Sequence, residues 1–332
     1  MIIDLGDDVM KTVEINLDEI KLDDEFYFND DDVVIIDEAF KNNLPEEHKH
    51  NLSKLFDKLS AAPFGEVLAT PFNSEKTLIT YAKLDYSSPD VKFDRSFDEI
   101  DKLILNAIYS FYRAGNVLFT SRNILQHIFG NVTDHFKIAS ELVEIIEQHL
   151  DKLKYMRFSM DLKDKFGNDA AINRRGKKYR PVAIEKNLLV VSILKMKSVK
   201  NGKILNVYRV DQISPIFKYA EELKQITSWK TEYMRVPVRR TMPNALLCNY
   251  LLVKISLVKN DSNKYRNNGI LFQTIFEDLK LDVSTRDKKM NIRGTIKQMF
   301  DFWLKIGLLT SYKFEKKGTQ FYKISFTVKK NK

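Results

Sequence analysis

The C-terminal end of the chain constrains the fold most, because a helical pattern is followed there by two strand patterns. Lys288–Ile306 repeats apolar residues every three or four positions, which is the period of one helix face. Leu309–Glu315 and Phe321–Val328 alternate apolar and polar residues around a turn at Lys316–Thr319, which is typical of a β-hairpin. The sequence therefore predicts a helix packed on a basic-tipped hairpin, with these aromatic residues in the core: Tyr312, Phe314, Tyr322 and Phe326.

Two regions of the chain repeat one order of elements, namely a helix, a short strand, two further helices and a hairpin. In the first region the pattern begins near Ser96, with its third helix over Asp134–Leu153 and its hairpin ending in Ile204–Val210. In the second region the order begins with a helix over Pro243–Val258 and ends with the C-terminal hairpin. This is the order of a winged helix, whose three-helix core presents one helix to the DNA major groove while the hairpin contacts the backbone. We therefore predict an α+β fold with two winged-helix-like units.

A chain of 332 residues exceeds the usual size of one domain. We predict five segments, and the first is an acidic arm that is partly disordered or docks on a partner. The predicted boundaries are 1–60 for the acidic N-terminal arm, 61–95 for a strand and loop lead-in, 96–226 for the first winged-helix-like domain, 227–242 for a basic linker and 243–332 for the second winged-helix-like domain.

The net charge of +9 hides a steep gradient along the chain. Residues 1–50 carry a net charge of −12, whereas residues 151–332 carry +24. A positive potential of this size attracts polyanions over a long range. The gradient therefore favours a nucleic-acid partner for the C-terminal part of the chain.

The candidate nucleic-acid contacts are clustered cations, because long basic side chains neutralise phosphates and arginine also reads guanine edges. Five of them surround a glycine between Arg174 and Arg180, and three repeat every four residues beside the apolar face of the last helix. For the latter row an ordinary solvated helix face is an equal alternative. The predicted nucleic-acid-binding residues are His135, Lys137, Arg157, Arg174, Arg175, Lys177, Lys178, Arg180, Arg239, Arg240, Lys289, Arg293, Lys297, Lys313, Lys316 and Lys317. The predicted partner-binding residues of the arm are Asp23, Asp24, Glu25, Asp30, Asp31 and Asp32.

The sequence offers weak candidates for catalysis. It contains neither a Walker-type loop nor a Gly-x-Gly-x-x-Gly motif, and the single Cys248 cannot form a cysteine zinc cluster. His48 and His50 flank Lys49 in a polar stretch that we predict to be mobile rather than β-prone, which makes a relaxase metal pair improbable. Glu185 and Lys186 supply only half of a nuclease site. We predict no catalytic residue, no metal and no cofactor, with His127 on a helix flank and His149 on a helix exterior.

The sequence also predicts a cytoplasmic location. No apolar run is long enough to span a bilayer, and the N-terminus is acidic where a signal peptide would be basic.

Several stretches resemble the tandem winged-helix proteins of plasmids and integrative elements of Gram-positive bacteria, which include replication initiators. They are Phe97–Asn116, Thr120–Gly130, Tyr250–Lys254 and Trp303–Thr310. The resemblance covers residues 96–328 in layout. It implies binding to repeated origin sequences through both winged helices, as a monomer on DNA and as a homodimer in repression.

The leading hypothesis is therefore a sequence-specific double-stranded DNA-binding protein of a plasmid, phage or integrative element that initiates replication. A transcriptional regulator of the same fold is the nearest alternative. A phage-type inhibitor, whose acidic arm mimics nucleic acid on a replication or transcription protein, belongs to another class. A nuclease or relaxase is the third class, and nicking of supercoiled DNA would support it. The sequence leaves the DNA site and the oligomeric state open.

Overall fold

A computed structural model describes residues 26–28, 44–53, 56, 67–69, 81–86, 97–131, 139–161, 171–172, 178–179, 183–198, 204–222, 224–260 and 269–329. The chain divides into two compact units. The first unit consists of Met1–Pro45, Asn51–Leu125 and Ile138–Ile226, and the second consists of Glu46–His50, Gln126–Lys137 and Thr227–Lys332.

The first unit begins its regular structure with helix α3, Glu99–Arg113. Asp98 caps the helix by accepting hydrogen bonds from the backbone N–H groups of Ile100 and Asp101, and the Asp101 carboxylate accepts one from the Asp98 backbone N–H. This reciprocal capping box satisfies donors that a helix start leaves unpaired. The helix ends at Ala114, and the following Gly115 has φ +84°. Both are local sequence signals, since Ser96 and Asp98 are each suitable caps and Ala114-Gly115-Asn116 is a suitable stop.

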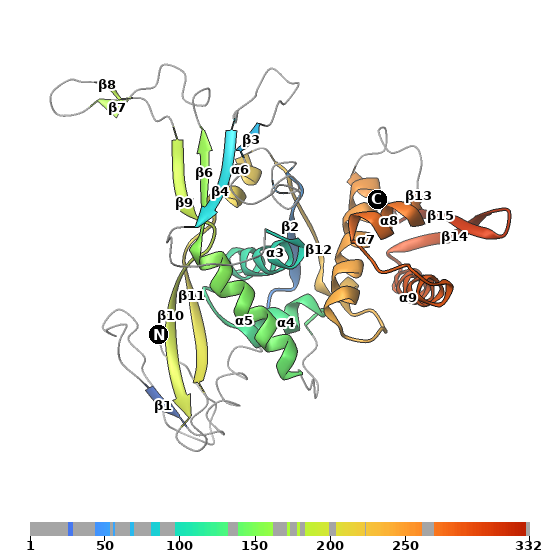
Figure 1. Cartoon of the computed structure of the whole chain (residues 1–332), viewed down its shortest axis with the longest axis horizontal. Coiled ribbons are helices and arrows are strands. Elements are labelled where there is room, and N and C mark those ends of the chain that lie inside the picture. The colour runs from blue at the N-terminus through green and yellow to red at the C-terminus, as the bar shows by residue number, and fades with distance from the viewer. Residues whose placement is uncertain are drawn as a thin grey trace. The chain divides into compact units, whose positions relative to one another are not determined.

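Three further helices and two four-stranded sheets complete most of the described part of the first unit (Figure 1). Strand β5 pairs antiparallel with β11, which pairs antiparallel with β10, so the short strand after α3 joins the edge of the long hairpin. The bounds are β5 Leu118–Thr120, α4 Ser121–Ile128, α5 Ser140–Tyr155, β10 Val190–Ser198 and β11 Ile204–Gln212. The other bounds are β1 Phe26–Phe28, β3 Val67–Ala69, β4 Tyr81–Tyr86, β6 Met156–Asp161, β7 Ala171–Ile172, β8 Lys178–Tyr179, β9 Ala183–Asn187 and α6 Pro215–Glu222. The sheet orders are β1-β10-β11-β5 and β3-β4-β6-β9, with β7 paired to β8.

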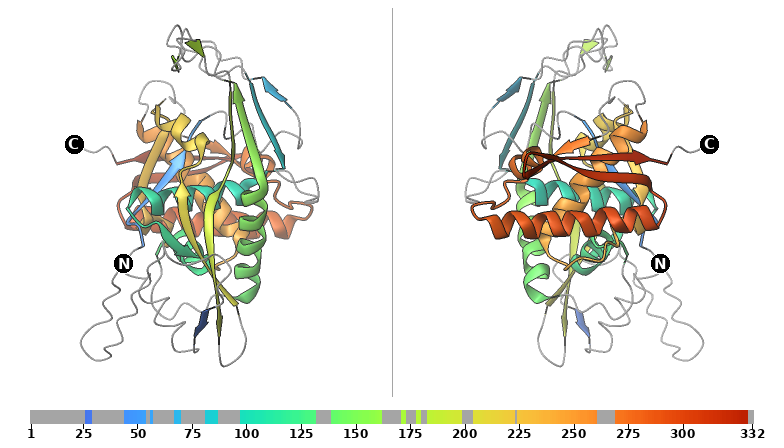
Figure 2. Two further views of the ribbon diagram at one scale, coloured as in Figure 1. Left: turned by 90° about the vertical axis from the view of Figure 1, so that its left-hand side faces the viewer. Right: turned by 90° about the vertical axis from the view of Figure 1, so that its right-hand side faces the viewer.

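The second unit has the same order of a helix, a short strand, two helices and a hairpin. Strand β13 pairs antiparallel with β15, and β15 pairs antiparallel with β14. Helix α9 runs alongside this hairpin (Figure 2). The bounds are α7 Met242–Asn260, β13 Gly269–Leu271, α8 Phe272–Asp278, α9 Arg286–Lys305, β14 Leu309–Lys317 and β15 Gln320–Val328. A second, two-stranded sheet joins β2 Glu47–Asn51 to β12 Ile226–Lys230, and the 3₁₀ helix Thr231–Met234 follows β12.

The core of the second unit is built from the inner faces of α7, α8, α9 and the hairpin. Trp303 of α9 is fully buried, and its indole N–H donates to the backbone carbonyl of Tyr233 at 2.7 Å. Phe300 packs on Phe326 of β15 with ring centroids 5.8 Å apart. Burial of apolar rings is the main favourable term in folding, and the indole bond removes the cost of a buried donor. These contacts hold α9 against the hairpin.

The structure confirms the predicted α+β class, with small sheets. The hairpin turn is shorter than predicted, because Lys316 and Lys317 belong to β14 and only Gly318–Thr319 separates the strands. Gly318 has φ +63°, which suits a two-residue hairpin turn. Among the described residues, no helix is long and apolar enough to cross a membrane.

One part of the predicted acidic arm was interpreted wrongly. Residues Glu47–Asn51 form strand β2, and the side chain of His48 is fully buried. Polar composition hid this strand, because its buried side chains are imidazoles and an amide instead of aliphatic groups.

Candidate nucleic-acid interface

Two cationic side chains from different elements meet at the ring of Phe321 on β15. The guanidinium carbon of Arg293 on α9 lies 5.6 Å from the ring centroid, and the Lys316 Nζ of β14 lies 4.7 Å from it. Arg293 also lies 5.6 Å from the ring of Phe272 at the start of α8. Cations are attracted to the faces of aromatic rings at such distances. Arg293 of the predicted helix row and Lys316 of the predicted hairpin tip therefore lie together. We call these two residues, with Lys289 and Lys297 of the same helix row, the α9–hairpin surface.

The α9–hairpin surface keeps most of its positive charge. Lys297 pairs with Asp301 at 2.8 Å, but both side chains are about half exposed, so solvent screens the pair. The Lys297 ammonium and then the Tyr312 hydroxyl hold the pKa of the Asp301 carboxyl below its usual range. The other members of this surface form no ion pair with a carboxylate in the described part of the chain. An extended polyanion would supply the counter-charge.

Lys313 does not join this surface. It alternates along β14 with Tyr312 and Phe314, which pack on the core, so Lys313 points to the other side of the hairpin. Glu315 lies on that side and accepts hydrogen bonds from Ser325 and Tyr322, which lower its pKa first, and Lys323 and Lys313 lower it further. This other side of the hairpin is therefore partly neutralised. Tyr322, which we predicted in the core, is exposed there.

Arg239 and Arg240 are exposed in the segment before α7. With Arg235, they line a cavity of about 190 Å³ whose floor is apolar, including Val236 and Cys248. Arg235 is already engaged, because its guanidinium donates to the backbone carbonyls of Gly130 at 2.5 Å and Asn131 at 3.3 Å. Arg239 and Arg240 belong to this cavity rather than to the α9–hairpin surface as defined.

In the first unit, helix α5 does not fit the predicted role of a second groove-reading helix. After Ser140 at its first position, its exposed residues are Glu141, Glu144, Gln148 and Asp151, which fall at helical spacing on one face. Three carboxylates on that face repel phosphates. A fourth, Glu147, accepts hydrogen bonds from Asn206 at 2.9 Å and from Ser121 and Tyr208. These carboxylates weigh against the prediction, which considered the apolar stripe and the nearby cations but not the exposed face itself.

Arg157 and Lys178 are further predicted nucleic-acid contacts that lie in the described part of the chain, in the first unit. Arg157 is half-buried on β6, opposite Asp85 of β4 and Asn187 of β9. Lys178 lies on strand β8 opposite Ile172. The residues that lie outside the described part are His135, Lys137, Arg174, Arg175, Lys177 and Arg180, together with the arm carboxylates Asp23, Asp24, Glu25, Asp30, Asp31 and Asp32.

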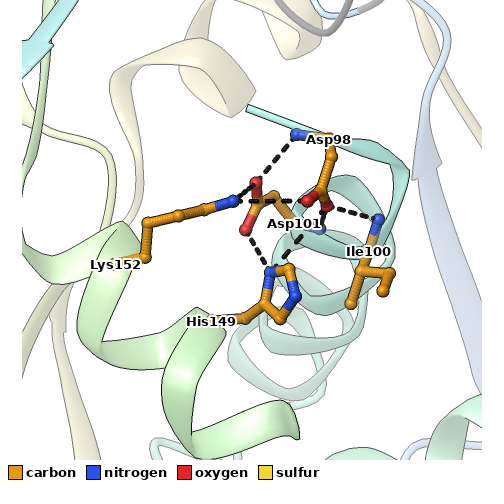
Figure 3. Close-up of polar contacts among 5 residues, drawn as sticks. All are labelled: Asp98, Ile100, Asp101, His149 and Lys152. Carbon is orange, nitrogen blue, oxygen red and sulfur yellow. Dashed lines mark hydrogen bonds and ion pairs between the residues drawn. The ribbon is translucent and has the colours of Figure 1, made fainter. Parts of the chain in front are cut away.

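A buried ionic cluster joins α3 to α5 in the first unit (Figure 3). The His149 Nδ1 lies 2.7 Å from an Asp101 oxygen, and the Lys152 ammonium contacts Asp101 and lies 3.4 Å from Asp98. The carboxylates and the imidazole are close enough to hold a metal, but Lys152 already supplies a positive charge between the carboxylates. Burial raises the pKa of the Asp101 carboxyl, and the hydrogen bond from His149 opposes that rise. His149 is thus buried, not on a helix exterior as predicted.

A buried chain of polar side chains runs through the second unit from β2 to the end of α4. His48 Nδ1 lies 3.1 Å from His127 Nε2, and His127 Nδ1 lies 3.2 Å from Asn131 Oδ1. Asn131 then donates to Thr231 at 3.1 Å. Because Asn131 accepts from His127, the proton of each imidazole is assigned to Nδ1. His127 is fully buried, not on a helix flank as predicted.

Burial sets the protonation of these imidazoles. It lowers the pKa of His127 to about 4, and it lowers the pKa of His48 well below 6.5, with further contributions from His127 and His50. The rings of His48 and His50 stack on Trp229 at centroid distances of 5.0 and 5.5 Å. The His48 ring is therefore a neutral core group and is not open to a substrate.

Comparisons with known proteins add little to this geometry. No protein-family model matches the sequence, and no curated protein does. The chain is similar to the crystal structure of RctB domains 2–3 at 10% identity and a TM-score of 0.44, over 83% of this chain and 97% of that chain. It is also similar to a selenomethionine derivative of domains 2 and 3 of RctB at 10% identity and a TM-score of 0.35, over 78% and 94% of the two chains. At this identity and these TM-scores, the likenesses carry no argument about function.

Proposed function

We propose that the chain is a sequence-specific double-stranded DNA-binding protein and that its second unit is the main DNA-binding part. In this proposal α9 enters the major groove, and the tip of the β14–β15 hairpin contacts the backbone. The proposal interprets the helix, strand, helix, helix and hairpin order as a winged helix. The pairing of β13 with β15 supports that interpretation, because it attaches the short strand to the hairpin.

One observation carries the proposal, namely the convergence of Arg293 and Lys316 on Phe321. Two cations gathered on one ring repel each other, so the arrangement is favourable when an anion lies against both. Their positions on a helix and on a hairpin suit an anion that extends along both elements. A DNA backbone is such an anion, and its contacts with cations dominate affinity.

We further propose a smaller role for the first unit. The carboxylates on the exposed face of α5 oppose entry of that helix into a groove, so its DNA contact would come from the basic segment Arg174–Arg180. This arrangement gives the two units different tasks. The second unit would select the sequence, and the first would add backbone affinity.

For the biological role, we propose replication initiation on a plasmid, phage or integrative element, by a binding protein rather than an enzyme. A transcriptional regulator would use the same geometry. Sequencing of duplexes retained from a random pool separates the two roles, because iterated repeats indicate an origin whereas a single palindrome indicates a repressor.

The decisive test compares Lys316→Gln with Lys313→Gln, which change the same residue type on two sides of one hairpin. The affinity for a duplex is measured from low to moderate salt. Log affinity falls linearly with log salt, and each lost phosphate contact makes this negative slope less steep by about 0.9. We expect that decrease for Lys316→Gln and little change for Lys313→Gln. A flat salt dependence of the unmodified chain would overturn the proposal.

A further inference from the structure

The outward line of helix α9 lies opposite its core-facing side. Ile296, Met299 and Trp303 are fully buried on the inner side. At 100° per residue, Gly294 lies almost directly opposite them. A line through Gly294 with spacings of four, three, four and three residues consists of Asp287, Asn291, Gly294, Gln298 and Asp301, and all five are exposed. The exposed Met290 and Lys305 lie on the same outward side of the helix.

Gly294 stands in the middle of this line, as the ninth of the 20 residues of α9. Glycine inside a helix is destabilising relative to alanine, so a structural reason for it is expected. The chain supplies none among its described residues, because a Cβ added at Gly294 would meet nothing within 4 Å. Its φ is not in the positive region either. Gly130 differs, since it has φ +86° and an added Cβ would lie 2.6 Å from Arg235 Cγ.

The neighbours of Gly294 on the outward line are both amides. Asn291 lies three residues before it and Gln298 four residues after it, so each is about one turn away. Neither side chain makes a hydrogen bond to another residue in the described part of the chain. Asn and Gln side chains can each donate to and accept from the major-groove edge of adenine, through its N6 and N7 atoms. The line ends in the carboxylates of Asp287 and Asp301, which do not suit this task because carboxylates repel phosphates. The Asp301 carboxylate accepts hydrogen bonds from Lys297 and Tyr312.

We propose that Asn291, Gly294 and Gln298 form a base-reading face that selects A·T pairs in the DNA major groove. Gly294 lets the helix axis approach the base edges by the width of a missing side chain. The two amides then reach adenines on either side of the closest point. The cations of the α9–hairpin surface flank this face and hold the backbone. The inference rests on the proposed DNA binding and adds the residues that read the sequence.

Charge complementarity identifies DNA as the occupant of this face. Residues 231–332 carry a net charge of +13. Arg293, next to Gly294 in the sequence, lies on the flank of α9 that faces Phe321, where Lys316 also lies, and Lys297 is exposed next to Gln298. Uncharged amides between cations are the pattern of a surface that reads bases while its rim binds phosphates.

The test uses Gly294→Ala in the full-length chain and two measurements that should move in opposite directions. The probe is the duplex that the unmodified chain retains from a random-sequence pool, together with an unrelated duplex of equal length. We expect the thermal midpoint of the second unit to rise by about 2–4 °C, because alanine favours the helix. We expect the affinity for the selected duplex to fall about tenfold, while the affinity for the unrelated duplex stays unchanged.

The amides are tested with Gln298→Ala and a matched control, Gln148→Ala, which removes an exposed amide from the middle of α5. Gln298→Ala and Asn291→Ala should each lower the preference for A·T over G·C at one position about tenfold. Gln148→Ala should leave every preference unchanged.

The outcomes separate this inference from the proposed function. If the unmodified chain retains no duplex, the proposed DNA binding fails, and the base-reading face fails with it. If it retains a defined duplex and Gly294→Ala binds that duplex equally well, only the base-reading face is overturned. The same holds if the selected duplexes lack A·T pairs at fixed positions.

Discussion

The guanidinium of Arg293 and the ring of Phe321 lie 5.6 Å apart, joining the exposed flank of α9 to the hairpin. Arg293 Nε is buried and has no hydrogen-bond partner in the described part of the chain. The guanidinium is therefore held by its aromatic neighbours, Phe272 and Phe321.

Arg293→Met should weaken DNA binding more than it weakens folding. Methionine keeps much of the apolar contact with Phe272 and Phe321, and a cation–π contact contributes about 0.5–1 kcal/mol at an exposed site. The free energy of unfolding should therefore fall by about 1 kcal/mol or less. The negative slope of log affinity against log salt should become less steep by about 0.9, because one phosphate contact is lost. Denaturant unfolding and salt titration measure the two effects.

Lys254→Met is the matched control for that experiment. Lys254 of α7 lies 4.8 Å from the ring of Tyr250 and 3.9 Å from a carboxylate oxygen of Asp278, and it is not a member of the α9–hairpin surface. The two variants should have similar effects on stability, but Lys254→Met should keep the full salt slope. Equal losses of DNA affinity would contradict the assignment of Arg293 to the interface.

The second unit should lose stability as the pH falls from 7 to 5. An unfolded imidazole takes up a proton below pH 6.5, whereas folded His127 does so only near pH 4. Acid in this window therefore favours the unfolded chain. His127 alone should lower the free energy of unfolding by about 2 kcal/mol between pH 7 and pH 5. Urea unfolding at several pH values measures the decrease.

His127→Gln checks the source of this pH dependence. The variant should be less stable at pH 7, because the bond to His48 is disturbed, but its stability should change less between pH 7 and pH 5. An unchanged pH dependence would show that the protons bind elsewhere.

Lys152→Met should strongly destabilise the first unit. It leaves the carboxylate of Asp101 buried without the ammonium, which costs about 3–5 kcal/mol for a broken buried pair. Lys154→Met, on the same helix, removes an exposed pair with Asp151 and should cost less than about 1 kcal/mol. The double variant Asp101→Asn/Lys152→Met should recover part of the loss, since no buried charge is stranded. Equal effects of the two single lysine variants would refute a structural role for the cluster.

The acidic arm can be tested without shortening the chain. Replacing Asp23, Asp24, Glu25, Asp30, Asp31 and Asp32 by the corresponding amides removes six negative charges. A DNA-binding protein should then bind duplexes as well as before or more tightly, because less negative charge opposes the phosphates. A nucleic-acid mimic should instead lose its protein partner, which a co-purification experiment would detect.

The elements that sequence reasoning predicted are those with a local, repeated pattern. The helical period of α9 repeats over several turns, and the alternation of β14 and β15 repeats over several residue pairs. The boundaries of these elements were therefore predicted correctly within a few residues. The cap at Asp98 and the stop after Arg113 are also local signals. Periodicity identifies the side of a helix that is buried and therefore also its exposed side.

The groups that sequence reasoning misplaced depend on partners far along the chain. His149 is buried because Asp101 lies 48 positions earlier, and His48 because His127 lies 79 positions later. No local pattern reports such a pair, and an isolated histidine in a polar stretch is more often exposed. The proposed role of Gly294 was missed for another reason. It depends on the absence of neighbouring atoms around the Cβ position, which the sequence alone does not report.

The assembly of the second unit from separate chain segments also bears on its synthesis. The Thr231 hydroxyl and backbone N–H both donate to the carbonyl of Glu46, 185 positions earlier. Strand β2 leaves the ribosome long before its partner β12 exists, and its buried edge must wait for residues 226–230 to emerge. The C-terminal helices and hairpin can fold locally as they are made, whereas the two-stranded sheet of the unit forms only when β12 joins the much earlier β2. A binding domain expressed from residue 243 onward would lack that closing strand.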